Sequence, residues 1–158
     1  MRSRTALWFE CKIRYEKTTE DGLVKKVTEQ YSIDALSYSE AEHRIIEEMG
    51  SFISGDFEVV SITRAAYKEV FFDDGDNLSQ QWYRAKLDFI TLDEKTEKEK
   101  RSRVTYLVQA SNLNRALKAV DSVMSGTMID YEAASISDTK LMDVFECKSE
   151  STDKELEG

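Results

Sequence analysis

The sequence contains no proline, and it has only six glycines in 158 residues. This scarcity excludes a collagen-like tract, a proline-rich ligand segment and a long flexible linker. Two cysteines, Cys11 and Cys147, are too few and too far apart for a disulfide framework or a CxxC-type metal motif. We expect two reduced thiols in a cytoplasmic protein.

Long apolar runs are also missing. No stretch approaches the roughly 20 apolar residues that a membrane helix requires, and residues 1–9 contain no apolar run of signal-peptide length. Hydrophobic residues make up 41% of the chain and charged residues 34%. This composition supports one globular domain whose elements each have one apolar face. The expectation is a soluble protein that does not enter a membrane.

Positive charge is in deficit, because the formal net charge is −9 and the sequence pI is near 4.8. Nucleic-acid binding draws on clustered lysine and arginine side chains that neutralise phosphates. The overall charge therefore argues against a nucleic-acid partner, while local basic patches remain compatible with one.

Recognisable catalytic motifs are absent: there is no GxGxxG, no Walker loop and no HExxH. His43 is the only histidine, so a multi-histidine metal site is excluded, and no nucleophile with an orienting partner can be named. Cys11 shares a strand face with Phe9 and Ile13, and burial there makes a thiol inert. We predict no catalytic residue, no cofactor, no metal and no enzymatic activity.

The chain does contain one sequence pattern that occurs twice. Residues 8–15 (WFECKIRY) and residues 82–89 (WYRAKLDF) lie 74 positions apart, and both alternate in the period-two manner of a half-buried strand. After each comes a polar turn, a second strand, a capped helix and a third strand. The pattern predicts an internal duplication of a ββαβ unit. The first repeat spans residues 1–72, an acidic connecting loop spans 73–81, the second repeat spans 82–147, and residues 148–158 form a disordered acidic tail.

Local signals place the helices and the breaks. Ser37 followed by Glu40 is a capping box, Gly50 is expected to stop the first helix in a left-handed conformation, and Asn112 and Gly126 bound the second helix. Residues 57–72 read as strand with a break near residues 65–66. A single ββαβ unit has too little core to stand alone. The expected fold is therefore α+β: one merged globular domain with pseudo-two-fold symmetry, whose mostly antiparallel sheet carries both helices on one face.

Two acidic features invite a chemical interpretation. Residues 73–77 (DDGDN) lack the twelve-residue spacing and the closing glutamate of a calcium-binding EF-hand. Glu58 and Glu132 occupy matching positions in the two repeats, and paired carboxylates can perform acid–base chemistry or hold a metal. Solvated strand ends explain both glutamates equally well, so neither is assigned a catalytic role.

The remaining feature is a tryptophan at the same position of both repeats, on a strand face otherwise made of charged residues. Three interpretations stay open: shielding of the core at a strand end, an anchor for a protein partner or a second copy, and a stacking platform for nucleotide bases. The candidate binding residues are Trp8, Lys12, Arg14, Trp82, Arg84 and Lys86.

Several short sequence segments resemble those of an uncharacterised domain family, a domain of unknown function found in Bacteroidetes genomes and their phages. The resemblance covers nearly the whole chain except the tail and is carried by residues 27–31, 34–37, 88–95, 107–111, 126–132 and 142–145. It implies a small cytoplasmic protein of bacterial or phage origin. It transfers no catalytic residue.

Together these observations favour a non-enzymatic binding or assembly module that uses the outward sheet face around Trp8 and Trp82 for a protein partner or for homo-oligomer formation. The alternative is an accessory protein that binds single-stranded nucleic acid or nucleotides by stacking. A small-ligand pocket between the repeats is a third and weaker interpretation.

Overall fold

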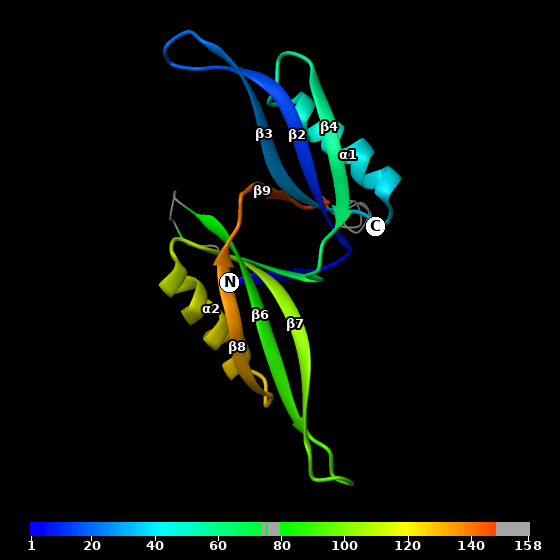
Figure 1. The fold of residues 1–158 in the computed structure, drawn as a ribbon, viewed down its shortest axis with the longest axis vertical. Helices are drawn as coiled ribbons and strands as arrows, with labels where there is room; N and C mark the ends of the chain where they lie inside the picture. Colours follow the sequence, from blue (N-terminus) through cyan, green and yellow to red (C-terminus); the bar gives the residue numbers. More distant parts are fainter. Residues whose placement is uncertain (74, 76–79, 148–158) are drawn as a thin grey trace, which may run out of the picture. The chain divides into compact units, whose positions relative to one another are not determined.

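The computed structural model describes residues 1–73, 75 and 80–147, so most of the acidic connecting loop and the whole tail predicted at 148–158 lie outside the described residues. Within these ranges the protein is α+β, as predicted, with two helices and nine strands in two mostly antiparallel sheets (Figure 1). The chain divides into two compact units, and the single merged domain expected from the sequence stays a prediction. One unit comprises residues 7–64 and the segment from Asp143 onward, and the other comprises residues 1–6 and 65–142.

The four-stranded sheet of the first of these units has the order β4-β2-β3-β9. Its elements are β2 (Trp8–Thr18), β3 (Val24–Asp34), α1 (Tyr38–Gly50), β4 (Phe57–Arg64) and β9 (Leu141–Phe145). The β2–β3 hairpin turns through Gly22, whose φ of +79° lies in the region that favours glycine.

The five-stranded sheet has the order β1-β5-β7-β6-β8. Its elements are β1 (Arg2–Thr5), β5 (Glu69–Phe72), β6 (Gln81–Leu92), β7 (Glu99–Ala110), α2 (Leu113–Ser125) and β8 (Asp130–Asp138). Neighbouring strands of this sheet are antiparallel, except that β5 runs parallel to β7.

The last strand of each half of the chain joins the sheet of the other half. β5 follows β4 in the sequence but pairs with β7, and β9 follows β8 but lies beside β3. The break expected near residues 65–66 is therefore present, and it is the place where the chain leaves one sheet for the other. The elements from β2 to β5 and those from β6 to β9 follow the same order, whereas β1 has no counterpart in the second half. The predicted duplication stays an interpretation.

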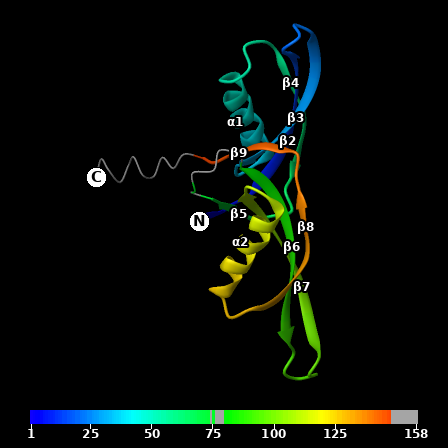
Figure 2. The same cartoon turned by 90° about the vertical axis from the view of Figure 1, so that its left-hand side faces the viewer.

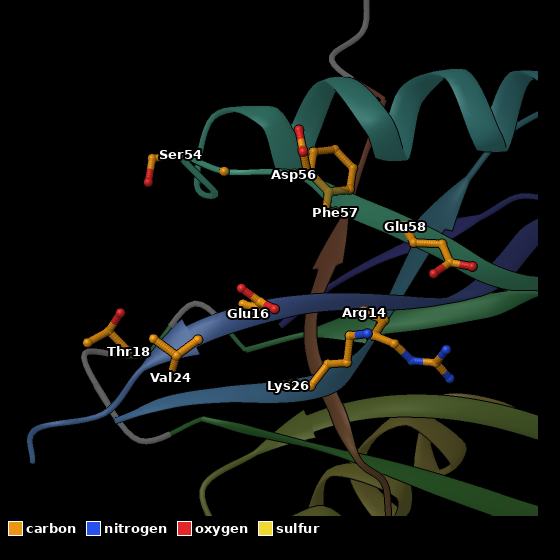
Figure 3. Close-up of a pocket in the computed structure, with 10 residues that line it drawn as sticks. Arg14, Glu16, Thr18, Val24, Lys26, Ser54, Asp56, Phe57 and Glu58 are labelled. Carbon is orange, nitrogen blue, oxygen red and sulfur yellow. The ribbon is translucent and has the colours of Figure 1, made fainter. Parts of the chain in front are cut away.

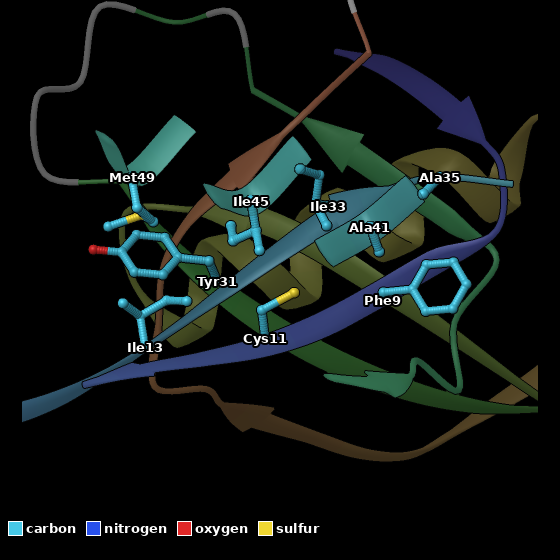
Figure 4. Packing of buried hydrophobic residues seen from close by; sticks show 9 residues of the cluster. All are labelled: Phe9, Cys11, Ile13, Tyr31, Ile33, Ala35, Ala41, Ile45 and Met49. Carbon is cyan, nitrogen blue, oxygen red and sulfur yellow. The ribbon is translucent and has the colours of Figure 1, made fainter. Parts of the chain in front are cut away.

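Each helix covers one face of its own sheet (Figure 2). In the four-stranded unit α1 contributes three buried side chains to a core that β2 and β3 complete from the sheet, and burying one such apolar side chain contributes about 1.5–3 kcal/mol. α2 does the same with Val120 and Met124 against Leu87 and Val108. The α1 cluster comprises Phe9, Cys11, Ile13, Tyr31, Ile33, Ala35, Ala41, Ile45 and Met49 (Figure 4).

The helices start and end where the sequence predicts, but the glycines at their ends do not have the predicted backbone conformation. The Ser37 hydroxyl accepts a bond from Glu40 N (3.1 Å), and the Glu40 carboxylate accepts one from Leu36 N (3.0 Å). Gly50 is the last helical residue, and the cap that follows has right-handed backbone angles. Gly126 has φ −77°, so neither glycine supplies the left-handed turn that its position suggested.

Candidate functional site

The two tryptophans are buried, which corrects the expectation that they form an outward binding face. Trp8 is 0% exposed and Trp82 is 4% exposed. Trp82 packs edge-on against Phe72, with the ring centroids 5.5 Å apart, and the Arg2 guanidinium lies 4.2 Å from the centroid of that phenylalanine ring. Phe72 belongs to β5 and Arg2 to β1, two strands whose place in this sheet the sequence pattern does not reveal. The indoles are therefore packing groups.

The charged residues predicted beside the tryptophans differ from them in exposure. Lys12 and Lys86 are exposed, whereas Arg14 and Arg84 are half-buried. Lys12 and Lys86 occupy equivalent places on the faces that point away from the helices, opposite Ser61 in one sheet and opposite Ser135 in the other. Trp8, Lys12 and Arg14 belong to one unit, and Trp82, Arg84 and Lys86 belong to the other.

A groove with a volume of about 550 Å³ opens on the four-stranded unit where β4 begins (Figure 3). Arg14 and Glu16 of β2, Lys26 of β3, and Asp56 and Glu58 at the start of β4 supply its charges. Arg14 is the only one of the six predicted residues among those that line it. The lining residues are Arg14, Glu16, Thr18, Val24, Lys26, Ser54, Gly55, Asp56, Phe57 and Glu58.

The charges of this groove are not paired with one another. Arg14 lies opposite Glu58 in the register, and Glu16 lies opposite Lys26. None of the four takes part in an ion pair within the described part of the chain. Three of the four are exposed and Arg14 is half-buried, so the groove offers charges to a charged partner.

In the five-stranded sheet, by contrast, the charged residues at the corresponding place are paired with one another. Arg103 Nε lies 2.6 Å from Asp88 Oδ1, and Arg101 Nη1 lies 2.7 Å from Glu132 Oε2. These hydrogen bonds lower the pKa of both carboxyls. Glu132 is therefore held in an ion pair while Glu58 lines a groove, and the two matching glutamates lie in different units.

A second hollow, of about 330 Å³, lies between α1 and β4 and is bordered by Tyr38, Ser39 and Glu42 on the helix. On the strand it is bordered by residues 59–62.

The register of β4 on β2 shifts between Lys12 and Ile13, which leaves Val60 as the extra residue of a β-bulge. Tyr38 is 54% exposed and Val60 38% exposed. This hollow therefore offers exposed apolar surface beside the outer strand of the sheet.

Sequence reasoning missed Tyr38 and Val60, although one signal was present. Val59 and Val60 are adjacent, which breaks the period-two alternation of β4 and is typical of a bulge. Ala133 and Ala134 break β8 in the same way, and the register of β8 shifts there as well.

Residues 7–147 match a protein family described as a domain of unknown function, DUF4494. The chain belongs to this family. No curated protein and no solved structure matches the chain. The DUF4494 match includes residues of both units.

The remaining candidate groups of this DUF4494 chain are dispersed. Burial, with a smaller contribution from Glu10, raises the pKa of Cys11 to about 12, which leaves its thiol protonated and unreactive. His43 is exposed and lies 2.9 Å from Glu47 on α1. Among the described residues no group of three or more His, Cys, Asp or Glu side chains could hold a metal ion. No helix in the described ranges is long and apolar enough to cross a membrane.

Proposed function

We propose that this chain is a non-enzymatic binding module that recognises an extended segment of a protein partner along β4. The binding surface, named here the β4 edge, consists of the strand itself, the hollow between it and α1, and the groove at its start. This proposal keeps the function expected from the sequence but moves it away from Trp8 and Trp82, because both side chains are buried.

The observation that carries the proposal is the position of β4 at the outer end of the sheet order, beside a hollow with exposed apolar side chains. An outer strand has main-chain N–H and C=O groups on one side that no neighbouring strand pairs. Peptide-binding domains use such edges by adding the peptide as a further strand, with side-chain pockets supplying specificity. Tyr38 and Val60 border the hollow that the α1-facing side chains of an added strand would enter.

The bulge at Val60 fits this use of the strand. Bulges at sheet edges discourage indiscriminate strand pairing and so protect a protein from aggregation. They also redirect single side chains at functional sites. A bulged edge therefore favours a partner segment that matches its local geometry over a segment that does not.

The other expectations from the sequence belong to the same proposal: a cytoplasmic protein of bacterial or phage origin, without enzymatic activity, with a second copy of the chain as another partner. The alternative of a nucleic-acid accessory protein has less support. Stacking of bases requires exposed aromatic side chains, and both indoles are buried.

The test is selection of peptides from a random twelve-residue display library on the full chain, followed by affinity measurement with the enriched peptides. We expect Val60→Lys to weaken their binding at least tenfold, because it replaces an exposed apolar side chain at the edge by a long charged one. Ala134→Lys is the matched control, since Ala134 is the exposed residue at the equivalent bulge of β8. It should change the affinity less than twofold.

Two results would contradict the proposal: no peptide is enriched, or the enriched peptides bind the Val60→Lys variant as well as the wild type. Mass measurement in solution covers the case of a second copy. A dimer that Val60→Lys converts to a monomer identifies another copy of the chain as the occupant of the β4 edge.

A further inference from the structure

We infer that the partner segment of the β4 edge alternates apolar and basic side chains, with the basic ones placed beside Glu58. This inference rests on the proposed function, because it assigns the chemistry of the segment that the edge would hold. It follows from the two faces of β4, which the register and the core contacts define separately.

One face of β4 is apolar and is directed toward α1. Phe57, Val59 and Ile62 all pack against the α1 core cluster. An added strand continues the faces of the strand that it joins. Every second side chain of the segment would therefore lie on the α1 side, where apolar groups would cover the exposed side chains of Tyr38 and Val60.

The other face of β4 is polar and carries a single charge. Glu58 lies opposite Arg14, Ser61 opposite Lys12 and Thr63 opposite Glu10, so these three point away from α1. Asp56 precedes the strand and lines the same groove as Glu58. Both carboxylates are without an ion pair in the described ranges.

Charge complementarity then determines which residue type is favoured at the alternate positions of the segment. A residue directly across from Glu58 on an added strand would be its cross-strand neighbour, and opposite charges in that relationship are favourable. The five charged residues of the groove are two bases and three acids, so the local balance is negative. The whole chain is acidic as well, with a net charge of −9, which favours encounter with a basic segment.

None of the outer strands of the two sheets combines basic with apolar residues in this alternation. β1 (RSRT) alternates its two arginines with serine and threonine, β8 and β9 contain no basic residue, and Arg64 is the only basic residue of β4. Arg64 lies opposite Phe9, on the α1-facing side of the strand. The occupant with the complementary pattern is therefore a segment of another protein.

Three labelled nine-residue peptides test the inference on the full chain by fluorescence anisotropy. One alternates valine and lysine, one alternates valine and glutamate, and one has the composition of the first with its lysines and valines in separate blocks. We expect the alternating basic peptide to bind at least tenfold more tightly than the other two. Its affinity should fall as salt is raised, because the deciding charges are exposed.

Two variants separate local from global charge. Glu58→Lys should weaken the alternating basic peptide about fivefold and strengthen the acidic one, as expected when a cross-strand charge pair is replaced by a repulsion. Glu20→Lys makes the same change of net charge in the exposed β2–β3 turn and should change either affinity less than twofold.

Failure of this inference can be told apart from failure of the proposed function. If Val60→Lys weakens all three peptides alike while their charge pattern and Glu58→Lys have no effect, the edge binds segments but does not select basic ones, and the inference is wrong. If none of the peptides responds to Val60→Lys, the β4 edge is not the binding surface. Equal effects of Glu20→Lys and Glu58→Lys would also overturn the inference, because the attraction would then be unspecific.

Discussion

Arg44 of α1 holds Asp34 at the end of β3 through an ion pair in which Nη1 lies 2.9 Å from Oδ1. The side chain of Asp34 is 3% exposed and that of Arg44 15% exposed. The same carboxylate oxygen accepts a hydrogen bond from the backbone N–H of Cys147, 2.6 Å away. One buried carboxylate thus ties the helix and the end of the described chain to the four-stranded sheet.

Replacing Asp34 by alanine should therefore destabilise the protein strongly. Removing one partner of a buried ion pair leaves the other charge uncompensated, and such changes cost about 3–5 kcal/mol in the free energy of unfolding. Urea denaturation measures the loss. His43→Ala is the control, because it removes a contact with Glu47 in which both side chains are largely exposed, and we expect a change below about 0.5 kcal/mol. Equal effects of the two substitutions would show that Asp34 is not the tie inferred here.

Trp82→Ala should lower stability without changing a binding surface. Trp82 is buried against Phe72, and truncating a buried tryptophan costs about 3–5 kcal/mol. Leu92→Ala is the control, since Leu92 is 66% exposed, and it should cost less than about 0.5 kcal/mol. The wild-type tryptophan fluorescence should resist quenching by acrylamide and by oligonucleotides. Ready quenching of both indoles by oligonucleotides at low salt would instead support the nucleic-acid alternative.

The exchange of strands predicts that the two halves of the chain fold only together. Fragment 1–73 contains β5 but lacks β7, and fragment 80–158 contains β9 but lacks β3. We expect each fragment alone to give a poorly dispersed NMR spectrum, and an equimolar mixture to recover the native one. A fragment 80–140, which lacks β9, should bind its counterpart more weakly. A fully dispersed native-like spectrum from either isolated fragment would contradict the prediction.

The ion pairs of the five-stranded sheet should stabilise the fold only above a defined pH. Arg103 lowers the pKa of Asp88 below its ordinary value of 3.8, chiefly through their hydrogen bond. A carboxyl whose pKa is lower in the folded state contributes stability that is present above its unfolded pKa and is lost as the pH falls through the folded value.

Asp88→Asn should accordingly be less stable than the wild type at pH 7, and the difference should vanish as the pH is lowered well below 3.8. Raising the salt concentration should reduce it as well, because the pair is exposed to solvent. Urea denaturation at several pH values measures the difference. Asp21→Asn in the exposed β2–β3 turn is the matched control and should show no difference at any pH. A difference for Asp88→Asn that persists at pH 2 would mean that the amide acts through packing and not through lost charge.

The candidate site was predictable only in part. Arg14 and Glu58 stood out in the sequence, and both line the groove at the start of β4. Tyr38 was not recognised, because a tyrosine in the first turn of a helix looks the same whether it faces a neighbouring strand or solvent. Its role depends on β4 lying at the outer end of the sheet, which is a property of strand order and not of any local pattern.

The sequence by itself determined the elements, because side-chain alternation and helix capping depend on neighbours along the chain. The strands beginning near Trp8 and Trp82, the helix starts at Ser37 and Asn112, and the break after Arg64 could all be read in advance. Only the tertiary structure decided which sheet receives β5 and β9, and which sheet face is covered. Alternation divides a strand into two faces, but the groups that cover them come from strands distant in the sequence. Phe72 is an example, because it packs against Trp82 and the indole that we expected on a binding surface is buried.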